Sequence, residues 1–268
     1  MSDTEAGLDR RRLPGGLTLR GLAPNAITAA AICVGLTGIR FAIVGDFERA
    51  VQAVIIAGLL DGVDGRIARL LKAQSRFGAE LDSLADSISF GVGPALIIYL
   101  WTLQPLHSVG WLAALAFALG CVLRLARFNA GLDLPDQPHK VAGFLTGVPA
   151  PIGAGLAFLP MYLWIASGNE RFAEPAMVAG WLLVISFLMI SSLPTLSWGK
   201  LRPRRGIRLE LIGVIALLAA AMLLEPWFTL VGLCLFYLLT IPVGMIAYWR
   251  VKRRLATQAQ IQEPSAPA

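Results

Sequence analysis

Charged residues are scarce in this chain of 268 residues. They make up 15% of it, whereas hydrophobic residues make up 56%. Soluble domains average about 25% charged residues. The mean hydropathy of +0.68 agrees with this imbalance. The composition therefore excludes an ordinary water-soluble domain and indicates an integral membrane protein.

Cysteine and histidine are also rare, with three and two residues respectively. Cys33, Cys121 and Cys234 lie far apart inside apolar runs, without the close spacing of metal-binding motifs. We expect all three to be buried packing residues and none to form a disulfide. Neither His107 nor His139, and no cysteine, belongs to the acidic segment at residues 61–86, so zinc is a less favoured metal for that segment.

The two ends of the chain lack long apolar runs. Residues 1–23 are polar and arginine-rich, and no compact apolar segment with a small-residue cleavage site follows them, so we expect no cleaved signal peptide. We expect residues 1–23 to be a cytoplasmic segment and residues 251–268 a disordered cytoplasmic tail. The membrane domain is then predicted to span residues 24–250.

Long apolar runs fill the rest of the chain. A membrane-spanning helix needs about 20 mostly apolar residues. We therefore predict an all-α, polytopic helical bundle of about eight transmembrane helices, with breaks at proline, glycine and polar residues. The predicted spans are residues 25–45, 48–71, 80–102, 108–130, 147–167, 174–194, 208–224 and 227–249.

Basic residues are distributed unequally between the two sides of these spans. The N-terminus and the loops after even-numbered spans lie on one side and are rich in arginine and lysine. The other side holds only Arg49 and Arg171, with Arg40 near it. Cytoplasmic loops carry such an excess, so both termini are predicted to be cytoplasmic. The net charge of +6 is then explained by contact with anionic membrane lipid, and no nucleic-acid partner is expected. The cytoplasm-side residues are Arg10, Arg11, Arg12, Arg20, Lys72, Arg76, Lys140, Lys200, Arg202, Arg204, Arg205, Arg208, Arg250, Lys252, Arg253 and Arg254.

Four aspartates interrupt the apolar pattern within DGVDGRIARLLKAQSRFGAELDSLAD, residues 61–86. A buried aspartate in a spanning helix costs about 2.5–3.5 kcal/mol on insertion scales. Asp61 and Asp64 are one helical turn apart, as are Asp82 and Asp86, and a short turn joins their helices. We expect the two acidic faces to meet near the cytoplasmic surface.

Converging carboxylates repel one another unless a cation lies between them. Hard divalent cations prefer oxygen ligands, so the residues predict a Mg²⁺ or Mn²⁺ site, and two ions would form a clamp for a phosphoryl group. A cation- or proton-coupled transporter is the alternative from another class, because transporters also bury carboxylates. A transporter has no need for Gly65, Ala68 and Gly78 at these spacings.

The pattern Asp61-x2-Asp64-Gly65-x2-Ala68-Arg69-x8-Gly78-x3-Asp82-x3-Asp86 resembles the signature of the CDP-alcohol phosphatidyltransferases. The resemblance implies a membrane enzyme that transfers a phosphatidyl group from a CDP-linked lipid, here CDP-diacylglycerol, to an alcohol and releases CMP. It implies that Asp61, Asp64 and Asp82 bind two divalent metal ions and that Asp86, at the same metal site, is the base. It also implies a homodimer in the cytoplasmic membrane, with the active site facing the cytoplasm.

Further residues are assigned to the CDP-lipid by the same resemblance. These are Asp61, Gly65, Ala68, Arg69 and Gly78. Residues 24–28, Pro-Asn-Ala-Ile-Thr, are similar to a family segment beside the nucleotide, which adds Asn25 and Thr28 as candidates. A plain helix start is the alternative interpretation of this segment.

The acceptor alcohol depends on residues beyond the aspartates. Residues 87–95, 124–129 and 143–151 resemble the branch of the family that uses L-serine. Arginine binds carboxylates and phosphates, so Arg124 and Arg127 are candidates for the acceptor, with Ser89 and Asn129 as hydrogen-bonding partners. Arg124 and Arg127 can also be simple lipid-phosphate anchors. Glycerol 3-phosphate, inositol phosphate and choline remain alternative acceptors, since the basic residue that often precedes the Gly147–Pro151 segment in the family is absent here.

Overall fold

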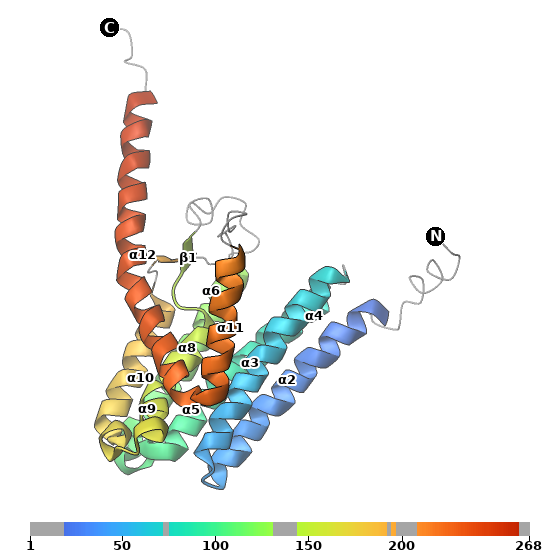
Figure 1. Ribbon diagram of the computed structural model, residues 1–268, viewed down its shortest axis with the longest axis vertical. Coiled ribbons are helices and arrows are strands. Elements are labelled where there is room, and N and C mark those ends of the chain that lie inside the picture. The colour runs from blue at the N-terminus through green and yellow to red at the C-terminus, as the bar shows by residue number, and fades with distance from the viewer. Residues whose placement is uncertain (1–18, 72–74, 131–143, 192–193, 197–207, 263–268) are drawn as a thin grey trace.

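The computed structural model describes residues 19–71, 75–130, 144–191, 194–196 and 208–262, and it is built almost entirely from helices (Figure 1). The predicted helical fold is confirmed, and each of the eight predicted spans coincides with a helical segment. In chain order the elements are α2 (Leu19–Ile43), α3 (Phe47–Leu70), α4 (Arg76–Asp86), η1 (Ser87–Val92), α5 (Gly93–Ile98), η2 (Tyr99–Leu103), η3 (Gln104–Leu106), α6 (His107–Ala130), β1 (Phe144–Thr146), α8 (Ala150–Ala157), α9 (Leu159–Ser167), η4 (Glu170–Ala173), α10 (Pro175–Ile190), β2 (Pro194–Leu196), α11 (Arg208–Leu224) and α12 (Pro226–Gln262).

Two helical stretches are each long and apolar enough to cross a bilayer, among the residues described. They are Leu22–Ile43 and the run Arg76–Ala130, and the pair α8 and α9 makes a third if it is counted as one bent span. The run 76–130 reverses at His107, whose φ of 49° ends one helical arm before α6 begins. These lengths support a membrane protein, and the full count of eight crossings stays a prediction.

Small residues bring α2 and α3 close together. A Cβ at Gly38 would lie 2.9 Å from the carbonyl oxygen of Ala50, so only glycine permits this approach. Ala42, Ala53 and Ala57 are also buried in the described core. Close packing of small residues is a common way to join helices in a bilayer. α2 thereby becomes the support on which α3 lies.

A second packed pair joins α6 to α10. Ser186 donates its hydroxyl to the carbonyl of Ala116 at 2.6 Å, and a Cβ at Gly120 would lie 2.6 Å from the Ser186 Oγ atom. Glycine therefore allows a hydroxyl of one helix to reach the backbone of the other. This pair continues the bundle on the side away from α2.

Three details differ from the pattern in the sequence. The predicted span 147–167 is divided into α8 and α9 with a bend of 41°, because Pro160 cannot donate the backbone hydrogen bond that would continue α8. A pair of three-residue antiparallel strands, β1 and β2, joins residues 144–146 to residues 194–196. The helix α12 continues through residues 251–262, which we expected to be disordered.

The cysteine prediction is right for two of three residues. All three thiols are free, and Cys121 and Cys234 are buried as expected. Cys33 is exposed, so the prediction that it packs in the core was wrong. An apolar run in a membrane protein does not distinguish a core-facing residue from one that faces lipid.

The ends of the site helices gather at one end of the molecule. In Figure 1, α2 begins, α3 ends and α4 begins at the upper right, whereas the α2–α3 turn lies at the bottom. The β pair also lies toward the upper end. This arrangement places the start of α2 beside both halves of the aspartate motif.

Candidate active site

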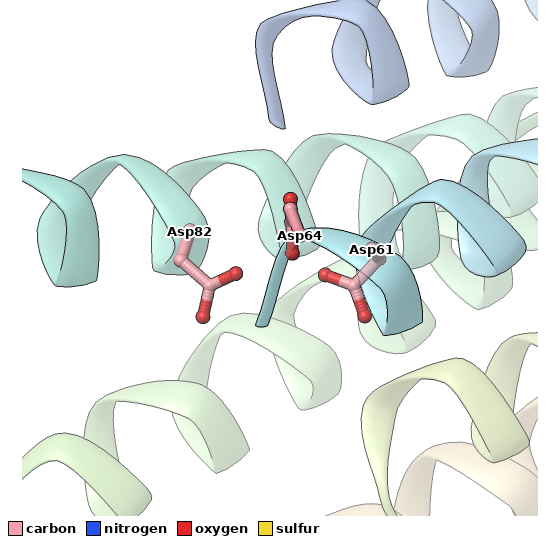
Figure 2. A group of neighbouring side chains, drawn as sticks. All are labelled: Asp61, Asp64 and Asp82. Atoms are coloured by element: carbon pink, nitrogen blue, oxygen red, sulfur yellow. The ribbon is translucent and has the colours of Figure 1, made fainter. Parts of the chain in front are cut away.

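Three of the four motif aspartates converge between α3 and α4. Oxygen atoms of Asp61, Asp64 and Asp82 all lie within 4.8 Å of one another. Figure 2 shows the Asp61 and Asp82 carboxyl groups directed toward each other, with Asp64 between them in this view. Asp64 is 3% exposed, Asp61 is half-buried and Asp82 is exposed. The predicted meeting of the two acidic faces is confirmed.

The ends of α3 and α4 are defined by side-chain caps. Asp46 accepts a hydrogen bond from the Arg49 amide at the start of α3, and Ser75 accepts one from the Gly78 amide at the start of α4. Such caps satisfy backbone groups that a helix leaves unpaired at its first turn. The cap at Ser75 sets the first turn of α4, and Asp82 follows within the same short helix.

α3 and α4 do not pack closely on each other along their lengths. Both contact α2, and the two make few close backbone contacts between themselves. The carboxylates therefore occupy the space between two helices that a third helix holds in place. Sequence reasoning expected α3 and α4 to be neighbours, but it did not identify α2 as their common support.

Thr28 of α2 is bound to this acidic group. Its Oγ1 atom lies 2.6 Å from Asp64 Oδ2 and 3.1 Å from the carbonyl oxygen of Pro24. A hydroxyl has one proton, and the carboxylate is both the nearer and the stronger acceptor. Thr28 thus orients the most buried carboxylate of the cluster.

A pocket of about 390 Å³ opens beside the cluster, and its walls come from α2, α3 and α4. Six of the seven residues predicted to contact the CDP-lipid line it, and Asp61 is the exception. The lining residues are Pro24, Asn25, Thr28, Asp64, Gly65, Ala68, Arg69, Ser75, Gly78, Ala79 and Asp82. Of these, Ser75 and Ala79 were missed by sequence reasoning, although Ser75 stands where a helix N-cap is expected.

The two glycines of the pocket have different surroundings. A Cβ at Gly65 would meet nothing within 4 Å and would project into open space. A Cβ at Gly78 would lie 3.0 Å from Asn25 Oδ1 and 3.2 Å from Ser75 Oγ. Gly65 therefore keeps the pocket wide, whereas Gly78 lets α4 approach α2.

Asp86 lies at the deeper end of the same group. Its carboxyl is within hydrogen-bonding reach of the Asp61 carboxyl, and it interacts electrostatically with Asp82 and Arg124. Its Oδ1 atom is buried without a hydrogen-bond partner in the described part of the chain. The π-helical segment η1 begins immediately after it. Such segments are frequent at functional sites.

The four residues predicted for the acceptor do not all face this site. Arg124 of α6 lies near Asp86, and its Nε atom is buried. Arg127 is exposed one turn further along α6. Ser89 is 2% exposed and lies against Gly35, where a Cβ would be 2.8 Å from its hydroxyl. The structure thus separates Arg124 from the other two.

Asn129 has a structural contact instead. Its Nδ2 atom donates to Ser83 Oγ at 2.8 Å, which links α6 to the helix that carries Asp82. Sequence reasoning did not single out Ser83, nor Tyr237 of α12, which interacts electrostatically with Arg124. No local pattern marks Tyr237, because more than 100 residues separate it from α6 in sequence.

The donor set fits a hard divalent cation. Each of the three converging aspartates offers a carboxylate oxygen, the ligand type that Mg²⁺ and Mn²⁺ prefer. In the described residues the ion pair between Arg49 and Asp46 lies at the other end of α3, and none neutralises the cluster. A cation bound here would relieve the repulsion between the carboxylates.

A larger cavity, of about 570 Å³, lies at the opposite end of the molecule. It is lined by Val44, Gly45, Asp46, Phe47, Glu48, Trp164, Ile165, Gly168 and Glu170. Two of its acids are already engaged, since Asp46 pairs with Arg49 and Glu170 accepts a hydrogen bond from Trp164 Nε1. None of the predicted site residues lies there, so size alone does not identify the site.

Comparison with known proteins agrees with the geometry. A family model described as CDP-alcohol phosphatidyltransferase matches residues 21–191, and one described as CDP-alcohol phosphatidyltransferase 2 matches residues 207–242. A Mycobacterium tuberculosis protein named CDP-diacylglycerol–serine O-phosphatidyltransferase is 37% identical over 240 residues, which cover 90% of this chain and 82% of that protein. Proteins of the same name from Mycobacterium leprae and Bacillus subtilis are 38% identical over 224 residues and 33% identical over 170 residues. These alignments cover 84% and 63% of this chain and 74% and 87% of the two relatives.

Proposed function

The chain belongs to the CDP-alcohol phosphatidyltransferase family, and we propose that it transfers a phosphatidyl group from CDP-diacylglycerol to the hydroxyl of L-serine, forming phosphatidylserine and CMP. The observation that carries this proposal is the convergence of Asp61, Asp64 and Asp82 beside a pocket lined by the other residues of the motif. The serine relatives, which align with most of the chain, support the choice of acceptor.

The pocket has the features that a nucleotide-linked lipid requires. Gly65 and Ala68 leave room for the donor to approach the backbone of α3, and Asn25 offers an amide at the opposite wall. Arg69 lies at the same pocket and can hold a phosphate oxygen. The negative charge of the donor pyrophosphate would therefore be neutralised by the Arg69 guanidinium and by the metal site together.

Asp61, Asp64, Asp82 and Asp86 would hold the metal, which we propose to be two Mg²⁺ or Mn²⁺ ions. When bound, the ions would neutralise charge on the pyrophosphate and on departing CMP. Thr28 keeps Asp64 oriented through its hydrogen bond. The chain thus supplies a set of carboxylates whose positions do not depend on flexible loops.

Asp86 would accept the proton of the attacking hydroxyl. An alcohol is a poor nucleophile near neutral pH, so a carboxylate base in reach of the hydroxyl is needed. The serine oxygen forms a bond to the phosphorus of the phosphatidyl group, the bond from that phosphorus to the CMP oxygen breaks, and the proton passes to Asp86. The Asp86 side chain is half-buried, and its Oδ1 atom is buried.

The protein is a membrane protein, and we propose the cytoplasmic membrane with the active site facing the cytoplasm. The excess of basic residues beside the site supports this orientation. We further propose eight crossings within residues 24–250, both termini in the cytoplasm, and assembly as a homodimer. Reactivity of single cysteines introduced at residues 2, 104 and 169 toward impermeant reagents in spheroplasts would test the topology.

The reaction is tested with purified protein in detergent. Labelled L-serine, CDP-diacylglycerol and Mn²⁺ should give phosphatidylserine and CMP in equal amounts. Product with glycerol 3-phosphate, inositol phosphate or choline but not with serine would overturn the acceptor and leave the family assignment standing. A transporter would instead move ions in liposomes and release no CMP.

A further inference from the structure

Two oppositely charged, half-buried side chains near the aspartate cluster lack full hydrogen bonding. Asp86 Oδ1 and Arg124 Nε are both buried without a hydrogen-bond partner in the described part of the chain. Leaving a buried polar group unpaired usually costs about 1–3 kcal/mol, and more for charged groups, so such atoms are rare in folded proteins. The proposed metal would complete the bonding of Asp86, so the Arg124 guanidinium is the group that a further ligand would complete.

Arg124 and Asp86 interact electrostatically but do not form a direct ion pair. They come from different elements, since Asp86 ends α4 and Arg124 lies in the last two turns of α6. The backbone between them is close-packed: a Cβ at Gly91 would lie 3.2 Å from Cys121 Cβ. This packing fixes the separation of the α6 backbone from η1.

A third element contributes to the same place. Tyr237 of α12 interacts electrostatically with Arg124, and its hydroxyl is buried. Arg127, one turn away on α6, is exposed and shares neither Asp86 nor Tyr237 as a neighbour.

We infer that Arg124 binds the carboxylate of the acceptor amino acid. This inference rests on the proposed function. Serine carries a hydroxyl and a carboxylate joined only through its Cβ and Cα atoms, so one molecule supplies a donor for Asp86 and an acceptor for Arg124. Ethanolamine and choline have the hydroxyl but no carboxylate, and they would leave the guanidinium unpaired.

A protein that buries a polar group for its substrate rejects analogues that lack the partner. The wild-type protein should therefore use L-serine at least about tenfold better than ethanolamine, measured as kcat/KM, which corresponds to one unsatisfied buried group. Glycerol 3-phosphate also offers an anionic group to Arg124. Comparing its turnover with that of serine shows whether the site prefers a carboxylate or binds any anion. Turnover of glycerol 3-phosphate equal to that of serine would overturn the specificity.

The decisive variant is Arg124→Gln, with Arg124→Lys as the conservative change. Arg124→Gln should raise KM for serine at least about tenfold while KM for CDP-diacylglycerol changes less than about twofold. It should lower kcat/KM for ethanolamine much less than kcat/KM for serine, so that discrimination between the two acceptors falls. Arg124→Lys should recover part of the serine affinity, because the charge remains without the planar guanidinium. Equal losses with serine and ethanolamine would show a structural role and overturn the inference.

Arg40→Gln is the matched control, because Arg40 is an exposed arginine in the last turn of α2, away from Thr28 and the pocket. It should leave the KM for serine, the KM for CDP-diacylglycerol and the kcat/KM for ethanolamine unchanged.

Competitive inhibition of the wild-type protein provides a further test, which does not depend on whether a variant folds. L-alanine has the carboxylate of serine but no hydroxyl, and it should compete with serine, whereas L-alaninamide should compete at least about tenfold more weakly. Equal inhibition by both would overturn the carboxylate contact. If the wild-type protein forms no phosphatidylserine at all, the proposed function fails first, and that result is distinct from loss of acceptor discrimination.

Discussion

The hydroxyl of Thr28 in α2 lies 2.6 Å from the carboxylate of Asp64 in α3. Both residues are almost fully buried, with exposures of 5% and 3%. The hydrogen bond joins the first helix of the candidate site to the aspartate motif. It gives a threonine outside the aspartate pattern a place in the proposed active site.

Replacing Thr28 by valine keeps the volume and removes this hydrogen bond. A hydrogen bond to a charged group contributes about 1.5–3 kcal/mol, so kcat/KM should fall by roughly 10- to 100-fold. The concentration of Mn²⁺ that gives half-maximal activity should rise. Thr37→Val is the matched control, since Thr37 donates to Cys33 within the same helix at 2.7 Å. Equal effects of the two changes would contradict a specific role for Thr28.

Asp86→Asn tests the base. The amide cannot accept the proton at the required step, and general bases contribute about 10²- to 10⁴-fold, so kcat should fall by that factor. Binding of CDP-diacylglycerol, measured by equilibrium binding in detergent, should change only a few-fold. Glu48→Gln, at an exposed acid in the first turn of α3, serves as the control. Loss of donor binding along with kcat would make Asp86 chiefly a metal ligand.

Removal of divalent metal should abolish turnover. EDTA treatment followed by gel filtration should give an inactive protein, and Mg²⁺ or Mn²⁺ should restore activity. Asp61→Asn, Asp64→Asn and Asp82→Asn should each raise the metal concentration needed, because each removes one charged oxygen ligand from the cluster. Full activity in excess EDTA would show that the carboxylates serve another purpose.

The Gly65→Ala substitution distinguishes an effect on the space in the pocket from an effect on the stability of the helix. The new methyl group meets nothing in the protein but enters the pocket, so KM for CDP-diacylglycerol should rise at least about tenfold without a fall in Tm. Gly62→Ala is the matched control on the same helix, since its Cβ also meets nothing within 4 Å and it does not line the pocket. Both changes should favour the helix by about 0.8–1 kcal/mol in propensity. A similar rise in KM for the two variants would argue against Gly65 as a pocket wall.

Gly78→Ala should behave differently. Its Cβ would press on Asn25 and on the Ser75 cap, so the variant should lower both Tm and donor affinity. Loss of the cap would cost about 1 kcal/mol and the contact with Asn25 adds to this cost, whereas alanine gains at most about 0.8–1 kcal/mol in helix propensity, so a small net fall in stability is expected. Thermal unfolding in detergent, followed by tryptophan fluorescence, measures it. An unchanged Tm would mean that Asn25 and Ser75 move aside without cost.

The local features of the site were readable from the chain itself. A helix turns about 100° per residue, so the spacing of Asp61 and Asp64, and of Asp82 and Asp86, determined that each pair shares a face. The short turn near Ser75 determined that the two helices run in opposite directions. Scarcity of charge and the long apolar runs determined that this happens in a membrane protein.

Tertiary structure alone decided which faces meet and which candidates take part. Arg124 and Arg127 are equivalent by spacing, but packing of α6 against η1 turned Arg124 toward Asp86 and left Arg127 exposed. Ser89 follows the motif by three residues, yet the close approach of Gly35 buried it against α2. Tyr237 reached the site from a helix that no local pattern connects to it. The reason is physical: helical periodicity acts over a few residues, whereas contacts between distant helices depend on where small side chains permit close packing.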